Sequence, residues 1–517
     1  MANLTTFSEK VLRYLEPDEN RWSYWLEKQE LQAVSDASCM HAFVDCIKNA
    51  REQNKKVIVC GDYDCDGILA TTIMVDGLQK YGLEVGFYIP NRIKEGYGLN
   101  CNTVSLAHKK GYELLVTVDN GVKAHDALSL AKESGMETIV TDHHRIEEEI
   151  CCDVLVHPTK MEESFSTLCG AAVAYECIRA LGVDTPYHLI LASIASIGDV
   201  MPVTHQTRAL IQNGLQLLNT SKEKHTYILA NDGMLNETSV GFQIVPKLNA
   251  IGRLSNMANV NNAVRYFLNQ DEREIRRFYD QIVHVNDMRK QISTKMTDCA
   301  LRKCTPQDPV SLVSDPSFHE GIIGLVAGSL CSQFQKPAIV LAQNTDSYKA
   351  SMRSPEGFDC MDFLSGFDDF RALGGHTQAA GFSLDLQSFP AFVKYVKKAG
   401  AAFHWTPLQK ETLHIEPEDI TTQSVQSLDA LRPFGPGFQL PAFEISPVNI
   451  KSVYDLSNGK HRRFTLQSGL QCLCFNISPS DKAKSVNSIR GFVGSPQINY
   501  YRGSKRVSFI IDQILYK

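Results

Sequence analysis

Short apolar runs rich in β-branched residues alternate with helical patterns in the first third of the chain, and this alternation restricts the fold more than any other feature. The runs that read as strands are 56–60, 84–89, 114–118, 137–141 and 154–156. Segments 67–81 and 123–134, which lie between strands, read as helices. Strands joined by helices pair in parallel, because the crossover returns the chain to the same end of the sheet. The sequence therefore predicts an α/β domain built on a parallel, doubly wound sheet.

After residue 156, the pattern of apolar and polar residues predicts further helices, a second α/β region and a β-rich C-terminus. Helical patterns at 170–181 and 187–197 follow the last strand of the first domain. Residues 261–303 are polar and contain neither Pro nor Gly, which predicts one long helix that bridges two domains. A second α/β region runs over 310–401. After residue 410, short β-like stretches separated by turns predict a small β-barrel similar to an OB fold.

A chain of 517 residues is too long for one hydrophobic core, so we expect several domains. The expected segments are an N-terminal helical segment (1–50), a catalytic α/β domain (51–215), a connecting region with the long helix (216–305), a second α/β domain that binds substrate (306–405) and a β-barrel that binds nucleic acid (410–517).

Composition excludes several classes of protein. The chain has no apolar run of about 18 residues, and its N-terminus mixes charges with apolar side chains, so we expect neither a membrane span nor a secretory signal. A cytoplasmic protein is expected. The 15 cysteines are scattered, which favours reduced thiols over disulfides or a zinc site. The net charge of −6 neither supports nor excludes a nucleic-acid partner.

Acidic and histidine side chains gather at the ends of the predicted elements. Three clusters directly follow the strands 56–60, 114–118 and 137–141, and a fourth follows the helix at 187–197. The clusters are Asp62-Tyr63-Asp64-Cys65-Asp66-Gly67, Asp119-Asn120-Gly121, Asp142-His143-His144 and Gly198-Asp199. In open parallel sheets, ligands bind beyond the carboxyl ends of the strands, so we expect the four clusters to converge.

Convergence would place six carboxylates and two imidazoles in one cleft. Carboxylates at such short range oppose one another's ionisation unless a cation neutralises them. Carboxylate ligands with an occasional imidazole suit Mn²⁺ or Mg²⁺ better than structural zinc. Two such ions activate a water and clamp the oxygens of a phosphoryl group. The pattern therefore predicts a divalent-metal site for phosphodiester hydrolysis.

Each cluster taken alone has a plainer interpretation. Asp119-Asn120-Gly121 fits an ordinary turn, the histidine pair fits a surface or core position, and the aspartates at 62–66 fit a solvated loop or an isolated Ca²⁺ site. The Gly and Glu that an EF-hand loop requires are absent. The joint occurrence of all four clusters at element ends within one α/β unit favours the metal site.

The same clusters resemble the four motifs of the DHH phosphoesterases, and the DxDxDG form of the first cluster resembles the RecJ branch. Five further segments resemble that branch: 90–99, 246–254, 318–327, 374–381 and 434–437. The departures are Cys65 where Ala is usual, Lys247 where Arg is usual, and Phe438-Gln439-Leu440 at the entry to the last domain. The resemblance covers about residues 55 to 445 and implies a DHH domain, a DHH-associated domain and an OB-like domain.

The resemblance also implies roles for individual residues. Asp119 is expected to bridge two metal ions. The other expected ligands are Asp62, Asp64, His143 and Asp199, without assignment of each aspartate to one ion. The residues expected to act in catalysis are His144, Asp66 and Asp142. Those expected to bind nucleic acid or its phosphates are Arg92, Tyr97, Arg253, Asn286, Arg289, His319, Arg353, Gly375 and His376. Two Mn²⁺ ions are the expected cofactor, with Mg²⁺ as the alternative.

A member of this branch is expected to be an exonuclease that digests single-stranded DNA from a 5′ end, in recombination and repair. The β-rich C-terminus fits, because OB folds bind single strands through stacking and a cationic groove. Residues 499–506 add tyrosine and basic side chains there. Single-stranded DNA is the expected partner, and the resemblance adds a single-strand-binding protein and a helicase. The chain is shorter at its ends than many members, so we expect it to lack an accessory C-terminal domain.

Two other functions stay open. A phosphodiesterase for short oligonucleotides or cyclic dinucleotides has the same core, although such enzymes are typically without the β-rich C-terminus. A catalytically silent scaffold, as in the eukaryotic replicative helicase, is disfavoured because scaffold relatives lose metal-ligand positions, and here all four motifs are filled.

Overall fold

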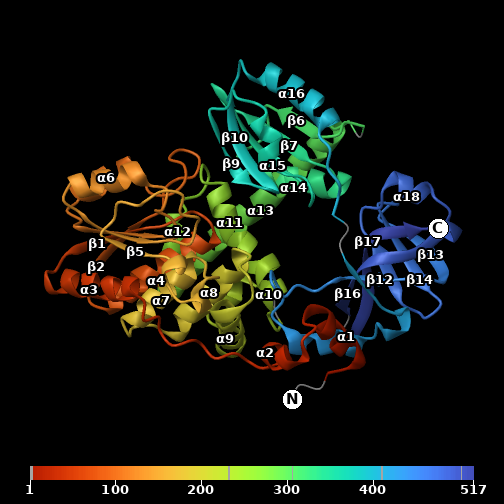
Figure 1. Ribbon diagram of the computed structural model, residues 1–517, viewed down its shortest axis with the longest axis horizontal. Helices are drawn as coiled ribbons and strands as arrows, with labels where there is room; N and C mark the ends of the chain where they lie inside the picture. The colour runs from red at the N-terminus through yellow and green to blue at the C-terminus, as the bar shows by residue number, and fades with distance from the viewer. Residues whose placement is uncertain (1–3, 231–232, 306, 409–410, 502–503) are drawn as a thin grey trace. The chain divides into compact units, whose positions relative to one another are not determined.

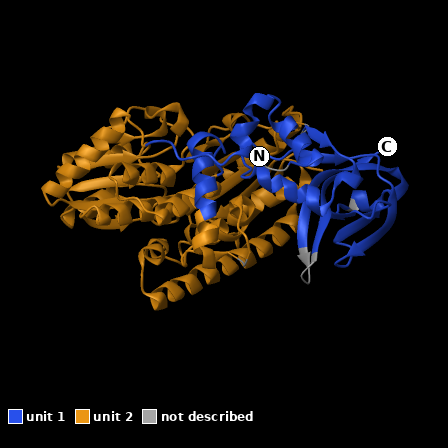
Figure 2. Ribbon diagram, turned by 90° about the horizontal axis from the view of Figure 1, so that it is seen from below, with its two compact units in different colours: residues 1–33, 200–216, 409–517 blue, residues 34–199, 217–408 orange. Residues whose placement is uncertain are grey.

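The computed structural model describes residues 4–230, 233–305, 307–408, 411–501 and 504–517 (Figure 1). The chain forms two compact units, coloured separately in Figure 2. Unit 1 comprises residues 1–33, 200–216 and 409–517, and unit 2 comprises residues 34–199 and 217–408. These units differ from the expected boundaries at 50 and 215, because residues 4–33 and 200–216 pack with the C-terminal domain. Residues 502–503 of the expected basic segment 499–506 lie outside the described residues.

The first sheet of unit 2 has five parallel strands in the order β2-β1-β3-β4-β5, which confirms the predicted α/β fold. The strands are β1 (Lys56–Cys60), β2 (Glu84–Tyr88), β3 (Leu114–Val118), β4 (Glu137–Thr141) and β5 (Val154–Val156). The helices are α3 (Ser38–Glu52), α4 (Cys65–Lys80), α5 (Cys101–Lys109), α6 (His125–Glu133), α7 (Gly170–Ala180) and α8 (Pro186–Gly198). Ile58, Leu115 and Val140 pack against α5 and α6, whereas α3, α4 and α7 lie on the other face (Figure 1). Because both faces are covered, β1, β3 and β4 are buried along nearly all their length. The polar residues that follow these strands lie at one edge of the sheet.

The sequence between the two α/β domains is helical. Its elements are α9 (His205–Ser221), α10 (Glu237–Ser239), a π-helical turn (Val240–Ile244), α11 (Val245–Arg253), α12 (Asn261–Leu268) and α13 (Glu272–Lys303). The prediction of one helix over 261–303 is wrong, because the chain breaks between α12 and α13. Asp271 explains the break: its carboxylate accepts the N–H of Arg273 at 2.8 Å and caps α13.

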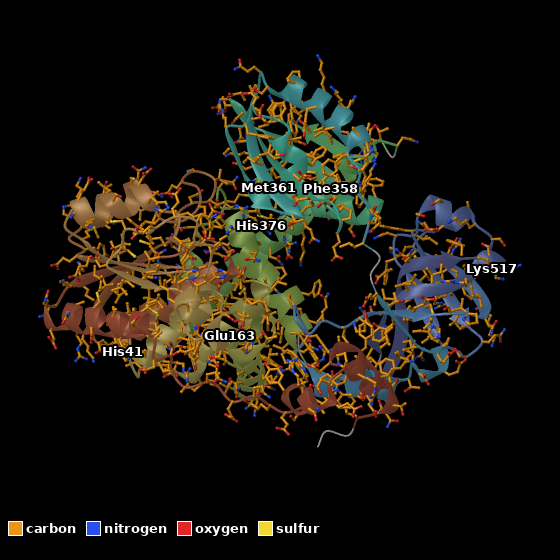
Figure 3. The ribbon with its side chains drawn as sticks, viewed as in Figure 1. His41, Glu163, Phe358, Met361, His376 and Lys517 are labelled. Atoms are coloured by element: carbon orange, nitrogen blue, oxygen red, sulfur yellow. The ribbon has the colours of Figure 1, made fainter. Side chains whose placement is uncertain are left out.

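The second sheet of unit 2 is mixed, in the order β6-β7-β8-β10-β9, with only β6 and β7 parallel. The strands are β6 (Ser311–Asp315), β7 (Ala338–Gln343), β8 (Ser347–Arg353), β9 (Ala372–His376) and β10 (Ala379–Asp385), with helices α14 (Ile323–Phe334), α15 (Cys360–Ser365) and α16 (Phe389–Ala402). Phe358, Phe363, Phe382 and Phe392 fill the core of this domain (Figure 3 labels Phe358). It is therefore a second α/β domain with its own core.

Unit 1 is built on a seven-stranded sheet in the order β11-β12-β16-β17-β15-β14-β13. The strands are β11 (Thr412–His414), β12 (Ala442–Ile445), β13 (Ile450–Leu456), β14 (His461–Leu466), β15 (Gln471–Cys474), β16 (Ile489–Tyr501) and β17 (Ser504–Tyr516), with helices α1 (Thr6–Leu15), α2 (Trp22–Leu26), α17 (Thr422–Ser427) and α18 (Pro479–Ala483). Phe7 of α1 stacks on Phe443 with ring centres 5.8 Å apart, and Trp25 of α2 stacks on Phe438 at 3.9 Å. The N-terminal helices thus share the core of the C-terminal sheet.

The described residues contain neither a membrane-spanning helix nor a cysteine metal site. Within the described ranges, no helix combines the length and hydropathy that crossing a bilayer requires. Every cysteine in them is free, and none belongs to a group of side chains that could hold a metal.

Arg208 of α9 is a fully buried cation in unit 1. Its guanidinium lies 4.9 Å from the ring centre of Trp25 and 5.2 Å from that of Phe438. It donates hydrogen bonds to the carbonyl oxygens of Trp25 at 2.8 Å and Pro433 at 3.1 Å. Carbonyl oxygens and ring faces both carry partial negative charge, so this arginine joins α2, α9 and the segment before β12.

Arg208→Met is expected to lower the free energy of unfolding of unit 1 by about 2–4 kcal/mol, because buried carbonyl oxygens lose their donors. Trp22 and Trp25, two of the three tryptophans, belong to unit 1, so tryptophan fluorescence during urea unfolding monitors it. Arg21→Met is the control, since the Arg21 side chain is 63% exposed. Equal midpoints for the two variants would contradict the structural role of Arg208.

Candidate functional site

The four acidic and histidine clusters converge beyond the carboxyl ends of β1, β3 and β4. His143 lies at their centre. Its Nε2 atom is 3.2 Å from Asp119 Oδ1, 3.6 Å from Asp199 Oδ2 and 3.7 Å from Asp66 Oδ2. Among the described residues, three groups have potential ligand atoms that all lie within 4.8 Å of one another: Asp119-His143-His144, Asp66-His143-Asp199 and Asp62-Asp64-Asp119.

The backbone at the end of β3 turns Asp119 into this group. Asp119 adopts a left-handed conformation with φ 59°, which Asp tolerates better than most residues. Its N–H donates to the carbonyl oxygen of Thr141 at 3.0 Å, and the hydroxyl of Tyr97 donates to its carbonyl oxygen at 3.1 Å. The amide of Asn120 donates to the carbonyl oxygen of Cys60 at 3.1 Å. These bonds fix the strand-end turn from both neighbouring strands.

Burial makes the carboxylate group electrically unfavourable without a counter-charge. Burial, then repulsion from Asp64, raises the pKa of Asp62. Burial, followed by repulsion from the carboxylates of Asp66 and Asp64, raises the pKa of two further aspartates. The pKa of Asp119 is raised well above its usual range, and that of Asp199 to about 8. Within the described part of the chain, Oδ1 of Asp62 and Oδ1 of Asp119 are buried and accept no hydrogen bond. Oxygens in this condition are what a bound cation satisfies.

His144 is held by Asp142. Asp142 Oδ1 lies 2.8 Å from His144 Nδ1 and accepts the backbone N–H groups of His143 at 2.8 Å and His144 at 3.1 Å. Asp142 Oδ2 accepts the N–H of Val122 at 3.0 Å. Burial opposes the change, but the bond between the two side chains raises the pKa of His144 and lowers the pKa of Asp142. With Nδ1 engaged by Asp142, the other ring nitrogen, Nε2, lies 3.3 Å from the hydroxyl of Tyr97.

Asp66 has both carboxylate oxygens in hydrogen bonds to backbone. Oδ2 accepts the N–H of Gly170 at 2.7 Å and Oδ1 accepts the N–H of Ala171 at 2.8 Å. These groups belong to the first turn of α7. Asp66, which the sequence analysis placed among the catalytic residues, is therefore tied to a helix end as well as lying in the carboxylate group.

A cationic pocket of about 590 Å³ adjoins the carboxylate group within unit 2. Three arginines line it: Arg92, Arg253 and Arg353. Burial, followed by repulsion from Arg92, Arg289 and Arg353, lowers the pKa of Arg253 to about 10. Such a cluster of guanidiniums suits an anion that several of them share.

The carboxylates and the cations meet in a second, smaller pocket of about 240 Å³. It contains Asp62 and Asp64 and shares Tyr63, Arg92 and Arg253 with the larger pocket. The guanidinium of Arg92 lies 4.8 Å over the ring of Tyr63. One polyanionic ligand could therefore contact the arginines and the carboxylate group together.

Comparisons with known proteins assign the three domains. The sequence matches the N-terminal domain of the DHH family over residues 56–198, the DHHA1 domain over 308–401 and the RecJ OB domain over 412–513. It is 32% identical over 496 residues to the single-stranded-DNA-specific exonuclease RecJ of Bacillus subtilis. The chain belongs to the RecJ family. The predicted OB domain and the resemblance to the RecJ branch are thereby confirmed.

Further relatives agree with this assignment. The RecJ of Thermus thermophilus is 31% identical over 81% of this chain. The T. thermophilus RecJ structure in complex with Mn²⁺ matches all of this chain and 76% of that one, with a TM-score of 0.85 and 25% identity. A structure of exonuclease RecJ bound to manganese is 30% identical, covering 72% of this chain and 97% of that one, with a TM-score of 0.64. The B. subtilis match covers 91% of this chain. The chain spans 63% of the length of the B. subtilis and T. thermophilus relatives.

Five residues with expected phosphate contacts lie outside the described linings of both pockets. Arg289 donates to Asn286 Oδ1 at 2.6 Å on α13. His319 accepts the N–H of Gly321 at 3.1 Å through Nδ1, which closes its own loop. The remaining two are Gly375, where a Cβ would lie 2.4 Å from the carbonyl oxygen of Ala379, and His376, which is exposed at the end of β9 (Figure 3). Their phosphate contacts remain predictions.

Two residues of α11, Asn249 and Gly252, also approach the site, although neither was predicted from the sequence. Asn249 Oδ1 accepts the N–H of Cys65, the first residue of α4, at 2.7 Å, and Asn249 lines the smaller pocket. A Cβ at Gly252 would lie 2.2 Å from the carbonyl oxygen of Tyr63, so α11 packs on the first acidic loop. Both residues lie in the 246–254 segment that resembles the family, which was the available signal.

Proposed function

We propose that this chain is a metal-dependent exonuclease that hydrolyses the phosphodiester bonds of single-stranded DNA, from a 5′ end by analogy with its family, in recombination and repair. The observation that carries the proposal is the buried carboxylate group around His143, which adjoins a pocket lined by three arginines. The names of the relatives support it. The proposed partners are single-stranded DNA and, by family resemblance, a single-strand-binding protein and a helicase, in the cytoplasm.

The carboxylate group fits a pair of divalent cations, Mn²⁺ or Mg²⁺. Two buried oxygens without hydrogen bonds, on Asp62 and Asp119, together with the raised pKa of Asp199, are what cations would relieve. The proposed ligands are Asp62, Asp64, Asp119, His143 and Asp199, with Asp119 shared. When bound, such ions acidify a water and withdraw charge from the phosphoryl oxygens.

His144 is the proposed proton carrier. Asp142 engages its Nδ1 at 2.8 Å, which leaves Nε2 to protonate the leaving oxygen or to bond a phosphoryl oxygen. The side-chain amide of Asn249, which lines the same pocket as His144, offers an uncharged hydrogen-bond donor. Because Asn249 Oδ1 accepts the N–H of Cys65, the amide orientation is fixed, and its NH₂ group remains for the pocket. The hydroxyl of Tyr97, 3.3 Å from the His144 ring nitrogens, completes the polar wall.

Recognition of the strand divides between two surfaces. Arg92, Arg253 and Arg353 are proposed to bind backbone phosphates, because guanidiniums contact phosphate through paired N–H groups. The OB domain is proposed to stack bases on exposed aromatic rings. Tyr454 is 56% exposed with the Arg463 guanidinium 5.2 Å from its ring centre, and Phe475 is 53% exposed.

The test is a digestion in Mn²⁺ of one sequence as a single strand and as a blunt duplex, labelled at either end. We expect release of mononucleotides from the 5′ end of the single strand, loss of activity with a chelator, and little attack on the duplex. A dinucleotide turned over faster than a long strand would instead favour the short-oligonucleotide phosphodiesterase. No metal-dependent cleavage of any of these substrates would refute the proposal.

A further inference from the structure

The first turn of α7 lies directly against the carboxylate group. Gly170 N–H and Ala171 N–H donate to the two carboxylate oxygens of Asp66 at 2.7 and 2.8 Å. Cys169, the N-cap residue of α7, makes no side-chain cap hydrogen bond. The first N–H groups of a helix have no acceptor within the helix and carry partial positive charge. Asp66, which projects from the first turn of α4, therefore serves as the cap of α7.

Gly170 is also where α7 meets Asp119. A Cβ built on Gly170 would lie 2.4 Å from the Asp119 Cβ and 2.6 Å from its Oδ1. The Asp119 side chain has little freedom to retreat, because its backbone is left-handed (φ 59°) and both its N–H and its carbonyl oxygen are hydrogen-bonded, to Thr141 and Tyr97. Any side chain at position 170 would therefore push the Asp119 carboxylate or lift the first turn of α7 away from Asp66.

We propose that Gly170 and the first turn of α7 are positioning elements of the carboxylate group: they hold Asp66 by both oxygens and set the place of the Asp119 carboxylate. Gly170 has no side chain to contact substrate or ion, and acts through these two aspartates. The inference rests on the proposed function, because it assigns this positioning to metal binding. Replacing a neighbour that orients metal ligands typically lowers metal affinity by about 10- to 100-fold.

The same pair of helices supplies a matched control. A Cβ at Gly77 of α4 would lie 2.4 Å from Cδ1 of Ile178 on α7, as tight an approach as that at Gly170. Gly77 lies three turns along α4 from Asp66, so its packing does not involve the carboxylates. Ala at either position perturbs the α4–α7 contact, but only the change at Gly170 touches metal ligands.

The experiment compares Gly170→Ala with Gly77→Ala in the full chain, with Mn²⁺ alone as the probe. Circular dichroism checks the fold, and isothermal titration calorimetry measures the dissociation constant of Mn²⁺ without substrate. We expect both variants to melt earlier than the wild type. Only Gly170→Ala should bind Mn²⁺ more weakly, by about 10- to 100-fold. Binding of Mn²⁺ by Gly170→Ala as in the wild type, or an equal loss in Gly77→Ala, would overturn the inference.

A second variant decides the matter if Gly170→Ala does not fold. Ala171→Pro removes the N–H that Asp66 Oδ1 accepts and leaves Gly170 unchanged beside Asp119, and proline is tolerated in the first turn of a helix. We expect Mn²⁺ affinity to fall by about tenfold; unchanged affinity overturns the inference. If the wild-type chain binds Mn²⁺ but cleaves no strand, the proposed function is refuted. The inference about Gly170 is still tested, because the calorimetric comparison measures Mn²⁺ binding without substrate.

Discussion

Asp119→Asn is expected to reduce hydrolysis of a labelled single strand on the order of 10³-fold or more, while affinity for the same strand stays nearly unchanged. Asp119 belongs to two of the three groups that could hold a cation in the described part of the chain, so its loss affects both proposed ions. Asn is a more specific replacement than Ala, because it removes the charge but keeps the side-chain volume beside Gly170. Asn also tolerates the left-handed backbone at φ 59°. Cleavage rates at saturating Mn²⁺ and strand binding by fluorescence anisotropy separate the two effects.

Asp126→Asn is the control for this experiment, since Asp126 is exposed on α6 in the same domain and makes the same change of charge. It should leave cleavage unaltered. If Asp119→Asn lost strand binding in the same proportion as cleavage, Asp119 would be a structural residue of the β3 turn. If it cleaved as well as Asp126→Asn, the carboxylate group would not be the catalytic site.

The parallel sheet could be predicted from the sequence because its strands are buried on both faces and read as mainly apolar runs, and because helices between successive strands require parallel pairing. The strand order β2-β1-β3-β4-β5 does not follow from these patterns. The break between α12 and α13 could not be predicted with the same ease. Residues 261–303 have continuous helical composition. The break lies at Asn269, where the backbone is extended, and at Asp271, whose carboxylate caps α13. A single polar residue of this kind is common inside helices as well.

The division into compact units was hidden from local patterns for another reason. Phe7 and Trp25 look like the apolar faces of ordinary amphipathic helices, and nothing nearby shows that their partners are Phe443 and Phe438, more than 400 residues later. A truncation near residue 410 would therefore expose the apolar faces of α1 and α2 rather than remove an independent domain. Point changes at exposed residues such as Tyr454 are the cleaner test of the OB surface.

The acidic clusters of the candidate site were visible in the sequence because they directly follow strands, and strand ends in a parallel sheet share an edge. Residues that approach this edge from elsewhere were not visible. Asn249 reaches the first turn of α4 from α11, and Gly170 matters only because Asp119 lies against it. Contacts of this kind depend on how the helices pack against one another. Nothing in the local sequence around Asn249 or Gly170 shows that packing.

Arg253→Met is expected to lower kcat/KM for single-stranded DNA by about 10²-fold, the kinetic equivalent of losing about 3 kcal/mol of charge-assisted hydrogen bonding to phosphate. Arg253 is the natural position to test, because it lines both the cationic pocket and the pocket that contains Asp62 and Asp64. Burial and neighbouring arginines already lower its pKa to about 10, so an anion that enters relieves repulsion as well as forming bonds.

Two further variants, Arg253→Lys and Arg265→Met, test whether this pocket binds phosphate. Lysine keeps the charge but lacks the fork of N–H groups, so we expect a loss between those of the wild type and Arg253→Met. Arg265 is exposed on α12 and its replacement should change little. If the pocket holds phosphates, the salt dependence of strand binding should also become shallower in Arg253→Met. Equal rates and salt slopes for Arg253→Met and Arg265→Met would show that the strand passes elsewhere, because a cation that contacts phosphate cannot be removed without weakening both.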